Sequence, residues 1–433
     1  MGRETFNYRK KAWEALKDPQ FQKGLQSIQM RIGKATLESY REVEGIEELR
    51  RKAKEIRLNA VDNLDEYIST FTQRVRQGGG EVFFAKDSES ARSILLELAL
   101  KHKVKKVVKG KSMVGEEIGI NHLLESEGIT PIETDLGEFI IQLAGERPSH
   151  ILGPAIHKSK EQIGRLFQEK LKVPYTNVPE ELTTIARNAL RDQFFEADMG
   201  ITGCNLAIAS TGQVMLVSNE GNIRFSITIP KVHLVIMGME RIVWSFREAL
   251  LLLQLLSRAA TAQSMATYVS IVGPQEKLSK NGTFYVLILD NGRSRISSDP
   301  DFKEILSCIR CGACLNICPV YGKIGGWAYG EVYSGPVGAV LNPLLFGVER
   351  YKDLFFGETL CGACKDICPL QIEIPRMLLE LRRRYKEGWD KYEIRPKKNL
   401  EYFAIKGFEH YSKSPRVYDL ITKIIAVFQR YRT

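Results

Sequence analysis

Apolar residues in the first 75 positions recur every three or four residues. The stretches FQKGLQSIQMRIGKATLESY and IEELRRKAKEIRLNAVDNLDEYISTFTQRVRQ both show this spacing. Such a spacing places the apolar side chains on one face of a helix. The pattern therefore predicts a helical N-terminal region over residues 1–75.

Short apolar runs alternate with amphipathic stretches over the next 220 residues. The runs lie at 78–85, 104–110, 150–155, 206–218, 232–238, 266–273 and 284–290. Helix-like stretches such as SARSILLELALKHK, SKEQIGRLFQEKL and SFREALLLLQLLSRAATAQ lie between them. Strands that alternate with helices are typical of a largely parallel sheet covered by helices. We expect an α/β domain with a Rossmann-like sheet over residues 76–295.

The pattern changes near residue 295, where strand-like runs fade and cysteine, glycine and proline cluster. Helical spacing returns from Pro375. We therefore expect a small, mainly α-helical domain at 300–385 and a basic helical tail at 386–433.

No stretch has the length of a membrane span. The most apolar run, ALLLLQLL at 249–256, is far shorter than the ~20 residues that cross a bilayer. The start, MGRETFNYRKKAWEALKD, lacks the apolar segment of a secretory signal. We expect a cytoplasmic protein, with any membrane contact peripheral and on the inner face.

The formal charge of +10 is concentrated near the end of the chain. Residues 376–433 hold fifteen Lys and Arg against seven Asp and Glu. A solvated helix face is the ordinary interpretation of such a charge run. Docking to an acidic partner or to an anionic membrane surface are the alternatives. Nucleic acid is not expected as a partner, because no recognised binding motif accompanies the charge.

Seven of the eight cysteines lie in two short runs, CIRCGACLNICPVYG at 308–322 and ETLCGACKDICPL at 358–370. The first run has the C-x2-C-x2-C-x3-C-P spacing of bacterial ferredoxins, whose fourth cysteine ligates the other of two clusters. Zinc typically takes four ligands as two separated pairs, and a disulfide framework is not expected without a signal peptide. The spacing predicts two iron–sulfur clusters of the [4Fe–4S] type.

The crossed arrangement assigns the seven cysteines to two sets. Cluster one takes Cys308, Cys311, Cys314 and Cys368. Cluster two takes Cys318, Cys361 and Cys364.

Cluster two lacks a fourth cysteine. It can be a [4Fe–4S] cluster with an oxygen or solvent ligand, a [3Fe–4S] cluster, or a cluster completed by a residue from elsewhere. Glu358 occupies the position that matches Cys308 and is a candidate ligand, although a glutamate there is more often exposed and solvated. The eighth cysteine, Cys204, is more often a buried small apolar residue than one that touches a cluster or a substrate.

The chain also resembles a known family in a series of ordered motifs. These are KSMVGEEIG, ETDLGEF, QLAGERPSHI, GITGCN, SNEGN, MGMERIV, LDNGRS, CIRCGACLNICPVY, GGWAYG, YSGPVGAVLNPLL and LCGACKDICP. Together they resemble the lactate utilization protein B family, the iron–sulfur subunit of an L-lactate dehydrogenase complex. The second cysteine motif of that family also carries three cysteines.

The resemblance implies a lactate-utilization domain with a CoA-transferase-like α/β fold, followed by a two-cluster ferredoxin-type domain. It implies an electron carrier in the oxidation of L-lactate to pyruvate. The implied partners are a cysteine-rich subunit of the heterodisulfide-reductase type and a small protein with a related α/β domain. Two positions depart from the family pattern, since Ser210 replaces an acidic residue and Trp327 replaces a frequent histidine. The loss of the acidic residue argues against acyl-transfer chemistry.

Other functions remain open at this point. The chain could carry electrons for a different 2-hydroxy acid or for a heterodisulfide-reductase-type complex. It could instead use the α/β domain as a transferase or small-molecule binder, with clusters that are only structural. No catalytic residue can be assigned from the sequence.

Overall fold

The computed structural model describes residues 6–274, 282–396 and 400–430. The chain divides into two compact units, residues 1–378 and residues 379–433. Each unit is described by itself.

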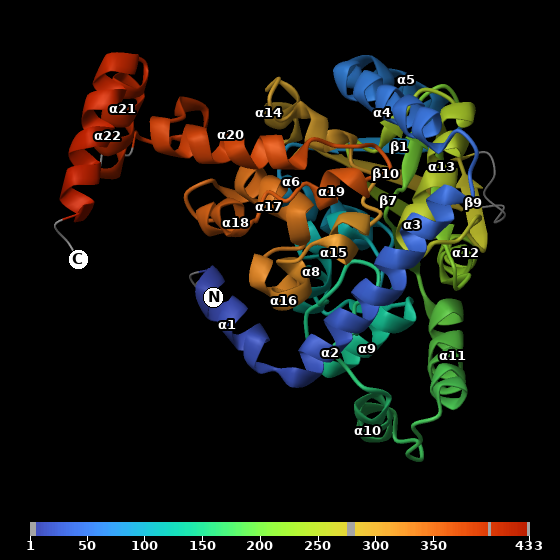
Figure 1. Ribbon diagram of the computed structural model, residues 1–433. Coiled ribbons are helices and arrows are strands. Elements are labelled where there is room, and N and C mark those ends of the chain that lie inside the picture. Colours follow the sequence, from blue (N-terminus) through green and yellow to red (C-terminus); the bar gives the residue numbers. More distant parts are fainter. Residues whose placement is uncertain (1–5, 275–281, 397–399, 431–433) are drawn as a thin grey trace. The chain divides into compact units, whose positions relative to one another are not determined.

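The N-terminal region is helical, as predicted. Its elements are α1 (Tyr8–Lys17), α2 (Pro19–Ile28), a π-helical turn η1 (Gln29–Gly33), α3 (Lys34–Arg41), α4 (Ile46–Asp62) and α5 (Leu64–Gln77). Asp18 caps α2 through its side chain, and Pro19 follows at the first helical position. Helices α1 and α2 and the turn η1 run beside α15 and α16 of the cysteine-bearing segment (Figure 1).

A six-stranded, fully parallel sheet forms the centre of the first unit, which confirms the predicted α/β class. Its strands, in spatial order, are β1 (Glu81–Ala85), β10 (Thr283–Leu289), β7 (Val232–Gly238), β4 (Met199–Thr202), β2 (Lys106–Lys109) and β3 (Thr130–Glu133). Every residue of β7 is buried, as expected for a central strand covered on both faces.

Helices cover both faces of this sheet. One face packs against α6 (Ser88–Lys101), α7 (Met113–Ile118) and α8 (Ile120–Ser126). The other packs against α9 (Leu136–Ala144), α10 (Lys160–Leu171) and α11 (Pro179–Glu196) at the β2–β3 end, and against α5 and α12 (Asn222–Thr228) over β1, β10 and β7. Side chains of β10 alternate between the two cores, with Phe284 in one and Tyr285 in the other.

A second sheet was not predicted. It contains β8 (Ile242–Val243), β5 (Leu206–Ile208), β6 (Gln213–Ser218) and β9 (Tyr268–Val272), and it is flanked by α13 (Phe246–Thr261). The run at 206–218 supplies the β5–β6 hairpin of this sheet. The two sheets share one hydrophobic core with α5.

The prediction of a strand at 150–155 is wrong. This run forms bends and turns in the segment between α9 and α10. The ring Nδ1 of His150 accepts the backbone N–H groups of Leu152 and Gly153, at 3.0 and 3.1 Å, and so fixes a turn.

The cysteine-bearing segment follows β10 as a series of short helices. They are α14 (Arg293–Ser297), η3 (Lys303–Ser307), α15 (Ala313–Ile317), α16 (Tyr321–Ile324), η4 (Gly326–Tyr329), α17 (Gly335–Phe346), α18 (Lys352–Gly357), α19 (Ala363–Asp366) and α20 (Ile374–Glu387). Helix α17 is buried almost throughout. Helix α20 begins in the first unit and ends in the second.

The second unit contains the end of α20, η5 (Asp390–Tyr392), α21 (Leu400–Ser412) and α22 (Pro415–Arg430). Part of its positive charge is compensated within the unit, since Arg383 and Arg384 both pair with Glu380. No described helix is long and apolar enough to cross a membrane.

Candidate metal centre

The two cysteine runs share the same backbone turn. Arg310 and Gly312 have positive φ angles of 60° and 77°, and Leu360 and Gly362 repeat them at 58° and 88°. A non-glycine residue with positive φ is uncommon and marks a strained, specified conformation. Each turn leads into a short helix, α15 or α19. The C-G-A-C sequences therefore form two copies of one structural loop.

The cysteines assigned to cluster one come together from both runs. Burial raises the pKa of Cys311 most, and the sulfur groups of Cys368 and Cys308 raise it further. For Cys314 burial again raises the pKa most, followed by Cys308 and Cys311, with smaller contributions from Cys364 and Cys368. Cys368 of the second run therefore lies beside the first run, which is the position that a crossed ligand needs.

The cysteines assigned to cluster two line one pocket with Glu358. The pocket encloses about 260 Å³ of empty space, part of it open to solvent, and its walls include Cys318, Cys361 and Cys364. Cys361 is exposed, whereas Cys318 and Cys364 are buried. Burial raises the pKa of Cys364 to about 12, and Glu358 and Cys361 contribute next. These four side chains thus form the second donor set.

Glu358 is buried and held in place, so the alternative of an exposed, solvated glutamate is wrong. Its exposed fraction is 8%. One carboxylate oxygen, Oε2, lies 3.6 Å from Cys318 Sγ, and the hydroxyl of Tyr329 donates to the other, Oε1, at 2.8 Å. The side chain therefore presents an oxygen atom at the point where the cysteine set is one ligand short.

Backbone N–H groups point at the sulfur atoms. The N–H of Arg310 donates to Cys308 Sγ and the N–H of Tyr321 donates to Cys318 Sγ, both at 3.4 Å. Gln29, from the π-helical turn η1, donates to the carbonyl of Cys318 at 2.8 Å. Hydrogen bonds of this kind hold thiolate ligands and tune the potential of a cluster.

The donor sets fit iron–sulfur clusters. Each cluster binds several irons through thiolates on separate iron atoms, so its ligands need not converge on one point. Among the described residues, no group of three or more His, Cys, Asp or Glu is placed to hold a single metal ion. Cluster one would be held by Cys308, Cys311, Cys314 and Cys368, and cluster two by Cys318, Cys361 and Cys364 with an oxygen from Glu358.

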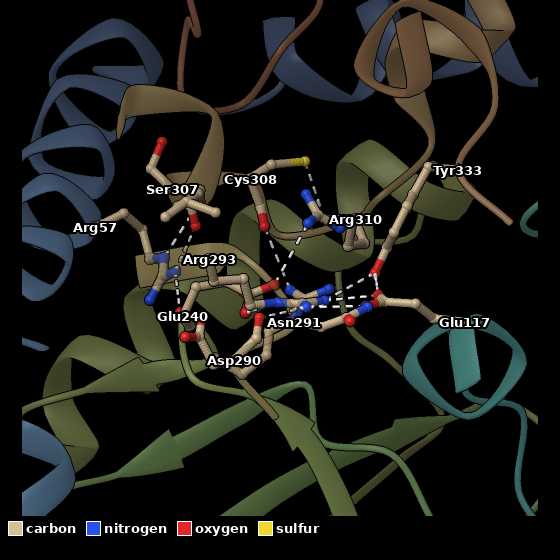
Figure 2. Close-up of polar contacts among 12 residues, drawn as sticks. Arg57, Glu117, Glu240, Asp290, Asn291, Arg293, Ser307, Cys308, Arg310 and Tyr333 are labelled. Carbon is tan, nitrogen blue, oxygen red and sulfur yellow. Dashed lines mark hydrogen bonds and ion pairs between the residues drawn. The ribbon is translucent and has the colours of Figure 1, made fainter. Parts of the chain in front are cut away.

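A buried network of charged residues lies beside Cys308, between the parallel sheet and the cysteine loops (Figure 2). We call it the arginine network. Its members are Arg57, Arg241, Arg293, Arg310, Glu117 and Glu240.

Arg293 forms ion pairs with both glutamates of the arginine network. It binds both oxygens of Glu117, at 3.0 and 2.7 Å, and its Nε lies 2.7 Å from Glu240 Oε2. The hydroxyl of Tyr333 also donates to Glu117, at 2.6 Å. Although burial opposes its charge, the guanidinium of Arg293 lowers the pKa of Glu240 to about 2. Arg293 is therefore the arginine that pairs with both glutamates, while Arg310 and Arg241 also lower the pKa of Glu240.

The other three arginines reach toward the loop of Cys308. Arg310 pairs more loosely with Glu240, at 3.4 Å, and lies 4.9 Å from the ring centroid of Tyr333. Arg241 donates to the carbonyl of Cys308 at 3.4 Å. Arg57 donates hydrogen bonds to four backbone carbonyls, those of Glu240, Ile242, Leu306 and Ser307. Burial lowers the pKa of Arg57 to about 10, which leaves it charged at neutral pH.

A second contact joins the α/β domain to the first cysteine loop. His150 Nε2 lies 3.0 Å from Asn316 Oδ1, and Asn316 lies between Cys314 and Cys318 in the sequence. Because Nδ1 of His150 accepts two backbone N–H groups, Nε2 carries the proton and donates to Asn316. Burial lowers the pKa of His150 to about 4, so the ring is neutral at neutral pH.

Sequence reasoning missed the arginine network. Glu240 and Arg241 lie in MGMERIV, Arg293 lies in LDNGRS and Arg310 lies in CIRC, so charged residues inside apolar motifs were the available signal. Arg57 gave none, because it lies in a helix rich in charged residues.

The remaining sequence candidates have structural roles. Cys204 packs against the hydrophobic core of the two sheets, and burial raises its pKa to about 12. Ser210 lies in the β5–β6 turn, where its N–H donates to the carbonyl of Trp244. The indole N–H of Trp327 donates to the carbonyl of Arg147, and its ring stacks on Phe21 at 5.0 Å.

Two protein-family models match the chain. A model described as the LUD domain matches residues 68–290, and one described as a 4Fe-4S dicluster domain matches residues 304–372. A solved structure of a DUF162 family protein from Deinococcus radiodurans covers 52% of this chain and 98% of that chain, with 13% identity and a TM-score of 0.30.

Several similar proteins align over most of the chain. Lactate utilization protein B of Bacillus velezensis is 44% identical over 94% of this chain and 85% of that protein. The protein of the same name from Bacillus subtilis (strain 168) is 45% identical over 90% and 82%. A protein of Escherichia coli (strain K12), named uncharacterized electron transport protein YkgF, is 44% identical over 86% and 78%. With its LUD domain, its 4Fe-4S dicluster domain and this similarity, the chain belongs to the lactate utilization protein B family.

Proposed function

We propose that the chain is the electron-transfer iron–sulfur subunit of a complex that oxidises L-lactate to pyruvate. The observation that carries this proposal is the pair of matched cysteine loops, and the pocket that Glu358 lines with Cys318, Cys361 and Cys364 supports it. The names of the similar proteins, lactate utilization protein B and electron transport protein, support the same role.

The proposal divides the chain by role. The helical region 1–75 and the α/β domain 76–295 enclose the first cysteine loop, residues 300–385 bind the clusters, and residues 386–433 form the basic tail. The two clusters would supply one-electron transfer, while the chain supplies ligands, burial and spacing. Electrons would leave for a quinone or for another carrier.

Each of the chain's own groups has a defined task in this proposal. Seven thiolates ligate iron, and Glu358 gives the missing oxygen ligand of cluster two. Tyr329 donates to Glu358 Oε1, which leaves Oε2 directed at Cys318 and the pocket. Arg50, buried on α4, donates to the carbonyl of Cys368 at 2.7 Å and fixes the crossed cysteine.

Electron exchange with a partner is proposed to occur on the side of cluster two. Cys361 is the exposed member of the seven, so cluster two comes nearest to the surface of the first unit. The proposed partners are the cysteine-rich subunit of the heterodisulfide-reductase type and the small protein with a related α/β domain.

The proposal is tested with this chain and its two partners, purified anaerobically and combined. Addition of L-lactate should bleach the visible absorbance of the clusters and yield pyruvate, only when all three proteins are present. D-lactate and the complex with Cys364→Ser serve as controls. Clusters that stay oxidised with L-lactate but are reduced by dithionite would contradict the role in lactate oxidation. Reduction by a different 2-hydroxy acid instead would keep the carrier and replace its substrate.

A further inference from the structure

The two cysteine sets lie in opposite electrostatic surroundings. The cluster-one set faces guanidinium groups, whereas the charged group placed against the cluster-two set is the carboxylate of Glu358. The reduction potential of an iron–sulfur cluster depends on nearby charge, on hydrogen bonds to its sulfurs and on solvent exposure. This difference between the two sets is therefore expected to separate the potentials of the clusters.

The arginine network carries a net positive charge. Its four arginines and two glutamates leave an excess of two positive charges in a buried site. Arg293 pairs with both carboxylates at 2.7 Å and Arg310 contacts Glu240 at 3.4 Å, so two carboxylates leave part of the charge of Arg57, Arg241 and Arg310 uncompensated. None of these three side chains is more than 8% exposed. The excess charge is thus poorly screened by water.

Arg241 donates to the carbonyl of Cys308, and Arg57 donates to the carbonyls of the two residues before it. Figure 2 shows Arg310 beside the sulfur of Cys308, with its backbone N–H bonded to that atom. Nη1 of Arg310 is buried and has no hydrogen-bond partner among the described residues. Arg50 of α4 donates to the carbonyl of Cys368 at 2.7 Å.

We infer that the arginine network gives cluster one the higher reduction potential of the two, so that one electron shared between them resides mainly on cluster one. A reduced cluster carries one more negative charge than an oxidised one, and unscreened guanidinium groups stabilise that charge. If Glu358 is the fourth ligand, cluster two has the same ligand charge as cluster one but lacks this compensation.

Exposure to solvent acts in the opposite direction, because it raises the reduction potential of cluster two. Water near the exposed Cys361 stabilises negative charge at cluster two. However, a charge in buried surroundings acts through an effective dielectric constant of about 20, against about 80 in water, so each buried guanidinium counts about four times as much. The excess of two such charges should therefore outweigh the exposure of one cysteine.

This inference rests on the proposed two-cluster carrier, and it is tested by redox titration of the anaerobic, full-length holoprotein followed by electron paramagnetic resonance. Two reduction waves are expected. The wave whose signal changes in Cys364→Ser belongs to cluster two and should have the lower midpoint. In wild-type protein, a cluster-one midpoint equal to or below that of cluster two would overturn the inference without any variant.

Charge variants then test the cause. Arg310→Gln should lower the cluster-one midpoint by about 59 mV, a tenfold change in the ratio of reduced to oxidised cluster for one electron. Arg310→Lys should restore most of the difference, and Arg241→Gln should act like Arg310→Gln. Glu117→Gln should shift the same wave upward, because it removes a negative charge from the network. The exposed Arg51→Gln on α4 is the matched control and should change neither midpoint.

Opposite shifts from Arg310→Gln and Glu117→Gln cannot arise from loosened structure alone. Equal shifts in one direction, or a shift confined to the cluster-two wave, would overturn the inference. These results are independent of the function test. Clusters that ignore L-lactate would contradict the proposed substrate and leave the order of potentials intact.

Discussion

Breaking the buried ion pair between Glu117 and Arg293 should strongly destabilise the first unit. The side chain of Glu117 is completely buried and accepts hydrogen bonds from Arg293 at both oxygens, from Asn291 at 2.6 Å and from Tyr333 at 2.6 Å. It thereby ties α7 to the β10–α14 turn and to the segment before α17. Glu117→Gln keeps the shape of the side chain and removes its charge.

The size of the effect follows from the loss of one of the two carboxylates that pair with Arg293. Breaking a buried ion pair by removing one partner costs about 3–5 kcal/mol, because a charge is left without compensation. Glu240 still pairs with Arg293, so the lower end, about 3 kcal/mol, is expected. With a denaturant slope of about 3 kcal/mol per molar for a unit of this size, the urea midpoint should fall by about 1 M.

The assay is urea unfolding of anaerobic holoprotein, followed by circular dichroism, on preparations of equal iron content. Glu97→Gln is the matched control, since Glu97 is an exposed residue of α6 and its replacement should change stability by no more than about 0.5 kcal/mol. A Glu117→Gln midpoint that equals the Glu97→Gln midpoint would refute the assigned role of the pair.

Three further outcomes are expected. Burial raises the pKa of Glu138 to about 8, so the stability that this carboxyl adds is fully present below pH 4.5 and is lost as the pH rises through about 8. The urea midpoint of Glu138→Gln should therefore rise relative to that of wild type between pH 5 and pH 9. A difference between the two midpoints that does not change with pH would contradict the raised pKa. Gly312→Ala should lower the unfolding midpoint more than Gly362→Ala. Both substitutions put an alanine at a positive φ angle, but only the first places a Cβ atom 2.8 Å from Ile151. Equal losses of stability would argue against close packing at the first loop. Cys204→Ala should leave the iron content and both cluster signals unchanged, and loss of either signal would show that the thiol is more than a core residue.

The sequence predicts the helical N-terminal region and the parallel α/β sheet because both depend on local periodicity, and it predicts the 4Fe-4S dicluster domain because that depends on motif spacing. Helical spacing identified α4 and α5, and apolar runs identified β7 and β10 to within about one residue. The failure at 150–155 has a local cause, since a ring nitrogen of His150 captures the two N–H groups that a strand would have used.

The charged part of the site depends on contacts across long separations in sequence. Arg57 meets Ser307 and Leu306 across about 250 residues, and no spacing within α4 distinguishes it from its solvated neighbours. Glu358 was a candidate by position alone, and only the packing of Tyr329 and the pocket of cluster two show that it is buried. Burial of a charged side chain is a property of the fold, so a single sequence could not reveal it.

⁵⁷Fe Mössbauer spectroscopy with iron analysis of the anaerobic full-length protein tests the proposal that seven thiols and one carboxylate bind two [4Fe–4S] clusters. About eight irons per chain are expected, one of which is a distinct site with an oxygen ligand. In Glu358→Ala that site should be lost, with cluster two converting to a [3Fe–4S] cluster, while cluster one is unchanged. About four irons per chain, or zinc in place of iron, would contradict the account.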